Sequence, residues 1–209
     1  MTRYKNNAIS NINMKILAFT DIHESKTKIA SILKEAKNVD LLVCCGDFTY
    51  FGHDTKGVLS ALNKLDKPVI LIHGNHENED EVETLCNKFK NIKFIHNKVY
   101  YLGNFAFFGH GGGGFSHIDK ELERLTKDVK KKVDKSKKLI FLTHAPPYGT
   151  KLDDIPFYGH VGCQSITKAI LELKPIIHLS GHIHETEGKK DKIGATLSLN
   201  PGKGKIITL

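Results

Sequence analysis

Residues 74–77, Gly-Asn-His-Glu, follow a short apolar run at residues 68–72, Pro-Val-Ile-Leu-Ile, with one residue, His73, between them. A β-branched run closed by glycine predicts a buried strand that ends in a tight turn. The turn then places Asn75 and His76 at the carboxyl end of a strand, where open α/β sheets form their ligand sites. Short motifs recur by chance, so the weight of this one depends on the rest of the chain.

Other short polar stretches likewise come just after runs that predict central strands. They are Asp21-Ile22-His23, Gly46-Asp47, Thr143-His144 and Gly181-His182-Ile183-His184. If the strands lie side by side, all of these loops meet at one edge of a sheet. Together with residues 74–77, that edge would gather two aspartates, one asparagine and five histidines.

Such a cluster is suited to binding two divalent cations. Carboxylate, imidazole and amide oxygen ligands favour Mn, Fe, Zn, Ni or Co. Residues i and i+2 of an extended segment point the same way, so Asp21 and His23 reach one cluster, as do His182 and His184. Asp47 can bridge two cations, and two cations about 4 Å apart can clamp a phosphoryl group for in-line displacement. Each stretch alone also fits a cap, a turn or a surface histidine, but the ordered set predicts a dinuclear metal centre.

The chain of 209 residues suits one domain with a sizeable core. We expect residues 1–13 to form a loose leader and residues 14–209 to form a single domain. The net charge of +8 favours anionic partners such as phosphate esters or nucleic acid. No apolar run is long enough to span a bilayer, and no secretory signal is visible. The cysteines fit small buried hydrophobes, and these features predict a cytoplasmic protein without membrane contact.

Hydrophobic periodicity predicts an alternation of strands and helices. Strands are expected at 15–20, 41–45, 69–72, 139–143, 176–180, 193–199 and 205–209, and helices at 25–36, 58–65, 79–88 and 166–173. Short runs at 92–95, 99–102 and 105–108 predict a second, more antiparallel sheet. A long basic helix follows, with an apolar face formed by Ile118, Leu122, Leu125, Val129 and Val133. Its lysines favour a solvated helix face over a nucleic-acid patch.

The ordered set D-x-H, G-D, G-N-H-E, H and G-H-x-H resembles the calcineurin-like metallophosphoesterase superfamily, from about residue 15 to the C-terminus. The stretches GDFTYFG at 46–52, THAPPYG at 143–149 and VGCQSI at 161–166 further resemble the metallophosphoesterase-domain-containing phosphodiesterase group. The resemblance implies an α/β fold, a four-layer α-β-β-α sandwich with two facing mixed sheets.

The resemblance also implies roles for the site residues. It implies two divalent metal ions, one held by Asp21, His23 and His184, the other by Asn75, His144 and His182, with Asp47 bridging them. Manganese is the favoured metal, with Fe, Zn, Ni or Co as alternatives. His76 would contact the phosphate next to Asn75 and protonate the leaving oxygen, and Glu77 would help orient the turn. From the residues alone, His76 is likewise a natural general acid beside a filled metal site.

The sequence departs from the family pattern at Tyr50. Many members carry an acidic residue three positions after the bridging aspartate, where it supports the catalytic histidine. Here that contact is absent, or it is supplied by the Tyr50 hydroxyl or by His53. The chain also lacks the Asp-Arg-Gly extension of protein serine/threonine phosphatases, and it is too short for the capping domain of the DNA-repair nucleases of this superfamily.

Two loops are candidates for substrate contact. The glycine-rich stretch at 109–114 is either a rim that offers His110 and Gly111 to the phosphate or a plain mobile loop. The loop at 146–162 carries Tyr148, Phe157 and Tyr158, which either stack on a base or cover the core, with cover favoured. We take His110, Gly111 and Tyr148 as candidate substrate-binding residues.

These observations together predict a metal-dependent phosphoric ester hydrolase. We favour a phosphodiesterase that acts on a small phosphoester or nucleotide by in-line attack of a metal-bound hydroxide, with His76 as the general acid. The alternatives are a phosphomonoesterase for small metabolites, a nuclease, and a non-catalytic metal-binding scaffold like the retromer subunit of this fold. The oligomeric state is not addressed by any of these motifs.

Overall fold

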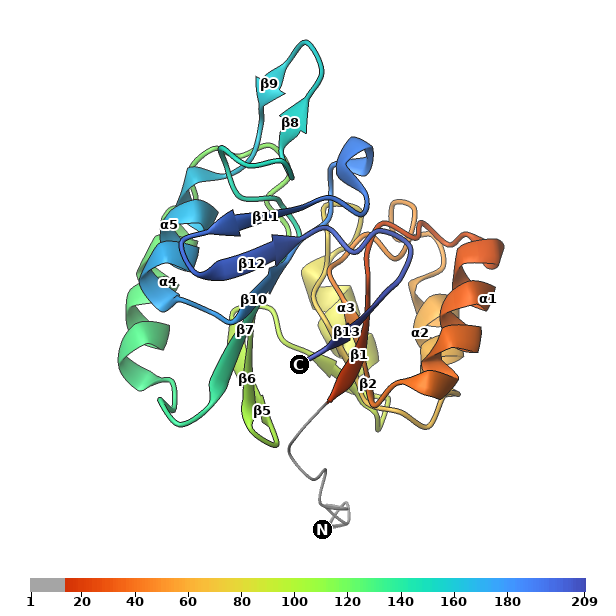
Figure 1. Ribbon diagram of the computed structural model, residues 1–209. Coiled ribbons are helices and arrows are strands. Elements are labelled where there is room, and N and C mark those ends of the chain that lie inside the picture. Colours follow the sequence, from red (N-terminus) through yellow and green to blue (C-terminus); the bar gives the residue numbers. More distant parts are fainter. Residues whose placement is uncertain (1–13) are drawn as a thin grey trace.

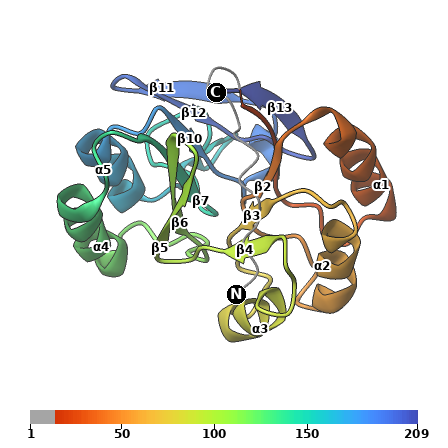
Figure 2. The same cartoon turned by 90° about the horizontal axis from the view of Figure 1, so that it is seen from below.

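The computed structural model describes residues 14–209, and the expected leader at residues 1–13 lies outside the described residues. Two sheets lie face to face with helices on both outer sides (Figure 1). The view from below shows the same four layers, with α1, α2 and α3 outside one sheet and α4 and α5 outside the other (Figure 2). The expected α-β-β-α sandwich is confirmed.

The first sheet has the strand order β13-β1-β2-β3-β4. Its parallel strands are β1 (Lys15–Phe19), β2 (Leu41–Cys44), β3 (Val69–Leu71) and β4 (Ile92–Phe94), and β13 (Lys205–Thr208) pairs antiparallel with β1. The strand at 92–94 was expected in the second, antiparallel sheet, and this expectation is wrong. A three-residue strand has too little alternation to indicate which sheet it joins.

The second sheet has the strand order β11-β12-β10-β7-β6-β5. Its strands are β5 (Lys98–Leu102), β6 (Phe105–His110), β7 (Lys138–Thr143), β10 (Ile177–Leu179), β11 (Lys190–Ile193) and β12 (Thr196–Leu199). The four central strands run parallel, and the outer pairs β5–β6 and β11–β12 are antiparallel. The single strand expected at 193–199 is therefore a hairpin, which turns at Gly194 in the left-handed region.

The helices cover the outer faces of the two sheets. They are α1 (Lys26–Glu35), α2 (Thr55–Asn63) and α3 (Glu79–Cys86) on the first sheet, and α4 (Lys120–Lys132) and α5 (Gln164–Leu173) on the second. Short 3-10 turns lie at η1 (Ala36–Asn38) and η2 (His184–Thr186), and β8 (Asp154–Ile155) pairs with β9 (Gly159–His160) in a hairpin. Among residues 14–209, no helix has the length and apolar character that crossing a bilayer requires.

Each central strand serves two cores, which explains its continuous apolar sequence. In β1, Leu17 and Phe19 pack toward the helices, whereas Ile16 and Ala18 pack between the sheets. Parallel strands buried on both faces have no polar alternation to show. The predicted cap at Ser25 is confirmed, because its side chain accepts a hydrogen bond from the Lys28 backbone N–H.

The apolar face predicted for the basic helix is confirmed except at Ile118, since Leu125 and Val133 also pack against the core beside it. Leu122 and Val129 are buried against the second sheet and α5, together with Thr126. Ile118 precedes α4 and is exposed, so it does not belong to the buried face.

Candidate metal centre

The five polar stretches come together, although their strands belong to two sheets. β1, β2 and β3 lie in the first sheet, and β7 and β10 lie in the second. The expectation of one sheet edge is thus corrected: the carboxyl ends of two facing sheets meet. Across this junction, Nε2 of His144 lies 2.9 Å from Oδ1 of Asn75.

Glycines allow the loops to approach this closely. A Cβ on Gly74 would lie 2.0 Å from Oδ1 of Asp47, and a Cβ on Gly181 would lie 2.0 Å from Oγ1 of Thr20. Asp21 and Asp47 themselves have φ angles of 52° and 50°, in the left-handed region. Backbone strain of this kind costs about 1–3 kcal/mol per residue and is typical of functional sites.

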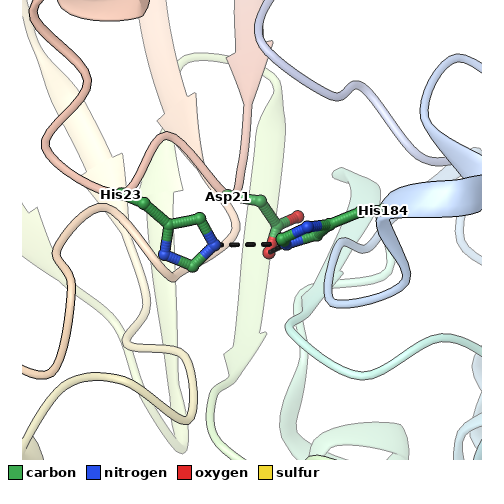
Figure 3. Close-up of side chains that lie close together, drawn as sticks. All are labelled: Asp21, His23 and His184. Atoms are coloured by element: carbon green, nitrogen blue, oxygen red, sulfur yellow. Dashed lines mark hydrogen bonds and ion pairs between the residues drawn. The ribbon is translucent and has the colours of Figure 1, made fainter.

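The first ligand group consists of Asp21, His23 and His184, whose ligand atoms lie within 4.8 Å of one another. Nε2 of His23 lies 3.2 Å from Nε2 of His184, which in turn lies 3.7 Å from Oδ1 of Asp21 (Figure 3). Nδ1 of His23 lies 3.0 Å from the carbonyl oxygen of Thr49. A carbonyl only accepts, so Nδ1 carries the proton and Nε2 presents its lone pair to the other two residues.

The second ligand group consists of Asp47, His144 and His182. Nδ1 of His144 donates to the carbonyl oxygen of Cys45 at 2.9 Å, so Nε2 is the nitrogen that faces Oδ2 of Asp47, 3.3 Å away, and Oδ1 of Asn75. Nε2 of His182 is buried and has no hydrogen-bond partner among the described residues. Once Nε2 of His144 loses its proton, nitrogen and oxygen lone pairs converge on one space, which is the arrangement a cation requires.

The charges within the second ligand group also indicate a cation site. Burial opposes a charge on His144, yet its hydrogen bond to the Asp47 carboxylate and the negative charge of that carboxylate raise the pKa of His144 to about 9. Burial also opposes a charge on Asp47, but His144 lowers the pKa of Asp47 to about 2. Burial and the neighbouring charge of His144 lower the pKa of His182 to about 4. The group thus holds one positive charge next to a carboxylate, and a metal ion can replace the proton on His144.

His76 lies beside Asp47, and its backbone N–H donates to Oδ1 of Asp47 at 3.0 Å. Nε2 of His76 lies 3.8 Å from Oδ2 of Asp47. The backbone N–H of Phe51 donates to Nδ1 of His76 at 3.2 Å, so the proton of the neutral ring is on Nε2, the nitrogen that faces the ligands. The alternatives left open at Tyr50 are resolved, because a main-chain amide makes this contact and His53 instead lies 3.3 Å from Glu24.

Glu77 orients both neighbouring turns, as the resemblance implied. Its carboxylate accepts hydrogen bonds from the backbone N–H groups of Asp47 at 3.0 Å, Gly74 at 2.7 Å and Thr49 at 2.8 Å. It also accepts from the hydroxyl of Thr49 at 2.7 Å. Burial raises the pKa of Glu77 despite these donors. The four donors fix the loops that carry the second ligand group.

Glu24 was missed by the sequence reasoning. Its Oε1 accepts from the backbone N–H of Asp54 at 2.8 Å and of Tyr50 at 3.1 Å, and these bonds lower the pKa of Glu24 against the effect of desolvation. Glu24 therefore holds the loop that brings the Phe51 amide to His76. Its position directly after Asp21-Ile22-His23 was the available signal, but a surface carboxylate at that position is also common.

Comparison with known protein families identifies the family of this chain. The model of the calcineurin-like phosphoesterase family matches residues 14–186. The chain belongs to this family. A protein of Methanocaldococcus jannaschii named only as uncharacterized, MJ1162, is 36% identical over 199 residues, which cover 90% of this chain and 88% of that protein. A UPF0046 protein of Caenorhabditis elegans is 26% identical, with coverage of 87% of this chain and 70% of that protein.

Two solved structures show the same kind of fold. The TT1561 protein of Thermus thermophilus superposes with a TM-score of 0.75 at 16% identity and covers 95% of this chain and 99% of that chain. A dimetal phosphatase of Danio rerio superposes with a TM-score of 0.63 at 10% identity, covering 90% and 86%. At these identities the likeness concerns the fold.

In this phosphoesterase, His110 is the last residue of β6 and Gly111 begins the loop that follows, and both are buried. The ring nitrogens of His110 contact Oδ1 of Asn97 at 2.6 Å and Oδ2 of Asp119 at 2.8 Å. The backbone N–H of Gly111 donates to Nδ1 of His96 at 2.8 Å. These contacts anchor the loop to its neighbours, so neither residue enters the proposal below.

Tyr148 lies elsewhere on the rim. Its ring is 36% exposed and lies 5.7 Å from the ring of His160 and 6.1 Å from the ring of His117. Phe157 and Tyr158, on the same loop, are exposed and do not cover the core. The expectation that they cover it is wrong, because the loop forms the β8–β9 hairpin, which projects from the body (Figure 1).

A second histidine group lies behind the turn at residues 73–77. His73, Glu79 and His96 place their ligand atoms within 4.8 Å of one another. Because Gly111 donates to Nδ1 of His96, Nε2 of neutral His96 carries a proton, and it faces Glu79 at 3.5 Å. Nδ1 of His73 is buried without a hydrogen-bond partner in the described chain. One unpaired nitrogen beside a protonated one does not make a metal site.

Proposed function

We propose that this calcineurin-like phosphoesterase is a phosphodiesterase that uses two divalent metal ions. Asp21, His23 and His184 would hold one ion, Asn75, His144 and His182 the other, and Asp47 would bridge them. The carrying observation is the convergence of ligand atoms at the second group, where His144 Nε2 faces two oxygens and His182 Nε2 is buried with no partner among the described residues. Asp47 belongs to groups with His23 and with His144, which supports its bridging role.

The donor set suits manganese, with Fe, Zn, Ni or Co as alternatives, since it combines imidazole nitrogens with carboxylate and amide oxygens. When bound, two such ions supply Lewis acidity that withdraws charge from the phosphoryl oxygens and lowers the pKa of a coordinated water. The protein contributes the positions of these ligands, which carbonyl contacts on Nδ1 of His23 and His144 hold in place.

His76 would act as the general acid. Its Nδ1 accepts from the Phe51 amide, so its Nε2–H points toward the ligands and can donate to a leaving oxygen. General-acid catalysis of this kind contributes about 10²- to 10⁴-fold. The proton moves from Nε2 to the departing oxygen, and the ring is then reprotonated from solvent.

Exposure of the first ligand group favours a diester over a monoester. The side chain of His184 is 61% exposed, so the centre is open on this side to a substrate with two organic arms. A small phosphodiester or a nucleotide fits this opening. A phosphomonoesterase remains the second candidate for the same residues. The free, buried cysteines support a reducing cytoplasmic location.

The test is hydrolysis of bis-p-nitrophenyl phosphate and p-nitrophenyl phosphate, measured metal by metal. We expect manganese-dependent turnover of the diester, and a fall of about 10²-fold or more in His76→Ala with its metal content unchanged. Preference for the monoester would favour the phosphomonoesterase. Bound metal without turnover of either ester would favour the non-catalytic scaffold.

A further inference from the structure

Exposed phenylalanine and tyrosine side chains lie on loops beside the metal centre. Among residues 14–209, seven such side chains are exposed, and of these only Tyr101, in the edge strand β5, lies within a strand. Tyr50 and Phe51 follow β2, Phe115 follows β6 and Tyr148 follows β7, whereas Phe157 and Tyr158 lie on the β8–β9 hairpin. Exposed rings bury little apolar surface on folding, so the three that lie against His76 and His182 indicate a binding role.

Phe51 stands directly against the proposed general acid. Its ring is 71% exposed, and its centroid lies 4.3 Å from that of His76. Tyr50 is 59% exposed, and its ring centroid lies 5.5 Å from that of His76. Phe51 also has a φ of 50°, a conformation that Gly or Asn adopts at lower cost. A bulky ring at this position is thus both strained and solvated.

Phe115 provides the corresponding ring on the other sheet. It is 63% exposed, and its centroid lies 4.6 Å from that of His182 in an edge-on arrangement. Phe51 follows β2 of the first sheet, whereas Phe115 follows β6 of the second. The metal centre is therefore flanked by exposed aromatic rings from both sheets.

We propose that Phe51, Tyr50 and Phe115 form a subsite for a flat aromatic ring carried by the phosphoester substrate. This inference rests on the proposed function, in which the group on the leaving oxygen departs beside His76 and therefore beside Phe51 and Tyr50. Offset and edge-on contacts between aromatic rings favour a planar group over an aliphatic one of similar size.

The decisive measurement is the binding of two phosphonates with the same head group, phenylphosphonate and methylphosphonate, to the manganese-loaded protein by isothermal titration calorimetry. We expect phenylphosphonate to bind at least about tenfold more tightly. Because neither probe has to be hydrolysed, this result does not depend on turnover.

A matched pair of variants separates the subsite from general surface effects. Phe51→Asn keeps the backbone N–H that donates to His76 and tolerates the left-handed φ. Phe157→Asn changes a fully exposed phenylalanine that also has a left-handed φ, 69°, but sits on the β8–β9 hairpin. We expect Phe51→Asn and Phe115→Ser to lower the phenyl-to-methyl ratio by about three- to tenfold, and Phe157→Asn to preserve it.

The outcomes distinguish this inference from the proposed function. A ratio near one in the wild type, or a ratio that Phe51→Asn and Phe115→Ser leave unchanged, overturns the subsite even if diesters are hydrolysed. A high ratio that falls in both variants supports it even if no diester is turned over. Comparing adenosine 5′-monophosphate with ribose 5-phosphate then shows whether a nucleobase is accepted as well as a phenyl ring. A self-association lost in both variants, with no change in the ratio, would instead assign the rings to an interface between copies.

Discussion

Two groups of histidines lie close together in this molecule, and their hydrogen bonding differs. In the metal centre, Nε2 of His144 faces oxygen acceptors, and Nε2 of His182 is buried with no partner in the described chain. In the second group, His96 accepts from the Gly111 N–H and turns its protonated Nε2 toward Glu79, so one unpaired nitrogen, Nδ1 of His73, lies beside a protonated one. Residue type alone therefore does not identify a metal site. The metal centre is distinguished by several ligand atoms that face one another with too few hydrogen-bond donors between them.

The largest effect is expected at Asp47, the proposed bridging residue, and the matched comparison is Glu79, the carboxylate of the second group. Asp47→Asn removes a charged oxygen from both proposed ion sites, and we expect diester turnover to fall by about 10³-fold or more, since metal ions supply several kcal/mol of transition-state stabilisation. Glu79→Gln, the matched change beside His96, should keep turnover within about twofold. Steady-state rates at saturating manganese make the comparison. Equal losses in the two variants would show that the comparison between the groups is mistaken.

A smaller loss is expected when the loop that positions His76 is released. Glu24 accepts the backbone N–H groups of Tyr50 and Asp54, and its removal in Glu24→Ala lets the Phe51 amide move away from His76. We expect kcat to fall by about tenfold, because modest misplacement of a catalytic group is costly. Glu83→Ala, which removes a surface partner of Lys98, is the control.

The readouts that accompany this change separate positioning from folding. Metal content and the melting temperature should be preserved in Glu24→Ala, and Glu24→Gln, which keeps one acceptor oxygen, should recover most of the rate. A variant that loses metal together with rate would place Glu24 in the metal centre instead.

Manganese should raise the melting temperature through the metal centre only. At a free concentration about 100 times the Kd, one bound ion stabilises the folded chain by about 2.7 kcal/mol, which is about 5–10 °C for a chain of this size. His182→Gln should lose much of the shift, whereas His96→Gln should keep it even if its own melting temperature is lower. Differential scanning calorimetry with and without manganese measures the shift. A shift lost in His96→Gln but kept in His182→Gln would reverse the assignment of the two groups.

The smallest effect is expected beside the second histidine group, where Asp119 contacts His110, whose ring stacks on that of His96, and caps α4. The hydrogen bond from His110 lowers the pKa of Asp119, so its contribution to stability is present above the unfolded pKa of about 3.9 and is lost as the pH falls through the lowered folded value. Asp119→Asn keeps a capping side chain, and we expect it to reduce the free energy of unfolding by about 1 kcal/mol at pH 7.

Urea unfolding at several pH values checks this sign. The gap between Asp119→Asn and the wild type should narrow as the pH falls from 5 toward 3. The exposed Asp128→Asn on the same helix, whose partner is Arg124, should change stability by no more than about 0.5 kcal/mol. A gap that is independent of pH would show that the charge on Asp119 does not stabilise the fold.

The sequence was informative about the site because each polar stretch follows a buried parallel strand, and both signals are local. The structure fits these signals in detail. Asp47, for example, adopts a left-handed φ in the loop after β2, and Gly74 packs closely against it. The sequence was less informative about which strands pair with one another. The strand at 92–94 pairs with β3, the strand directly before it in the chain, rather than with the β5–β6 hairpin that follows, and its three residues do not encode that choice.

Contacts made by main-chain atoms could not be read from residue types. The amide of Phe51 orients His76, and any residue but proline has such an amide, so the side chains of Tyr50 and His53 give no indication of this contact. The burial of His110 is a related case. A histidine within a glycine-rich stretch suggests an open loop, but the side chains of Asn97 and Asp119, which lie outside that stretch, hydrogen-bond to His110 and keep it buried.

The most direct test of the central claim is the number of metal ions per chain, counted by native mass spectrometry and by inductively coupled plasma mass spectrometry on the same manganese-loaded samples. We predict two ions in the wild type and in His96→Gln, and fewer than two in His182→Gln. Two ions in His182→Gln together with a loss in His96→Gln, or no bound ion in the wild type, would contradict the claim that unmatched acceptors at the junction of the two sheets form the metal centre.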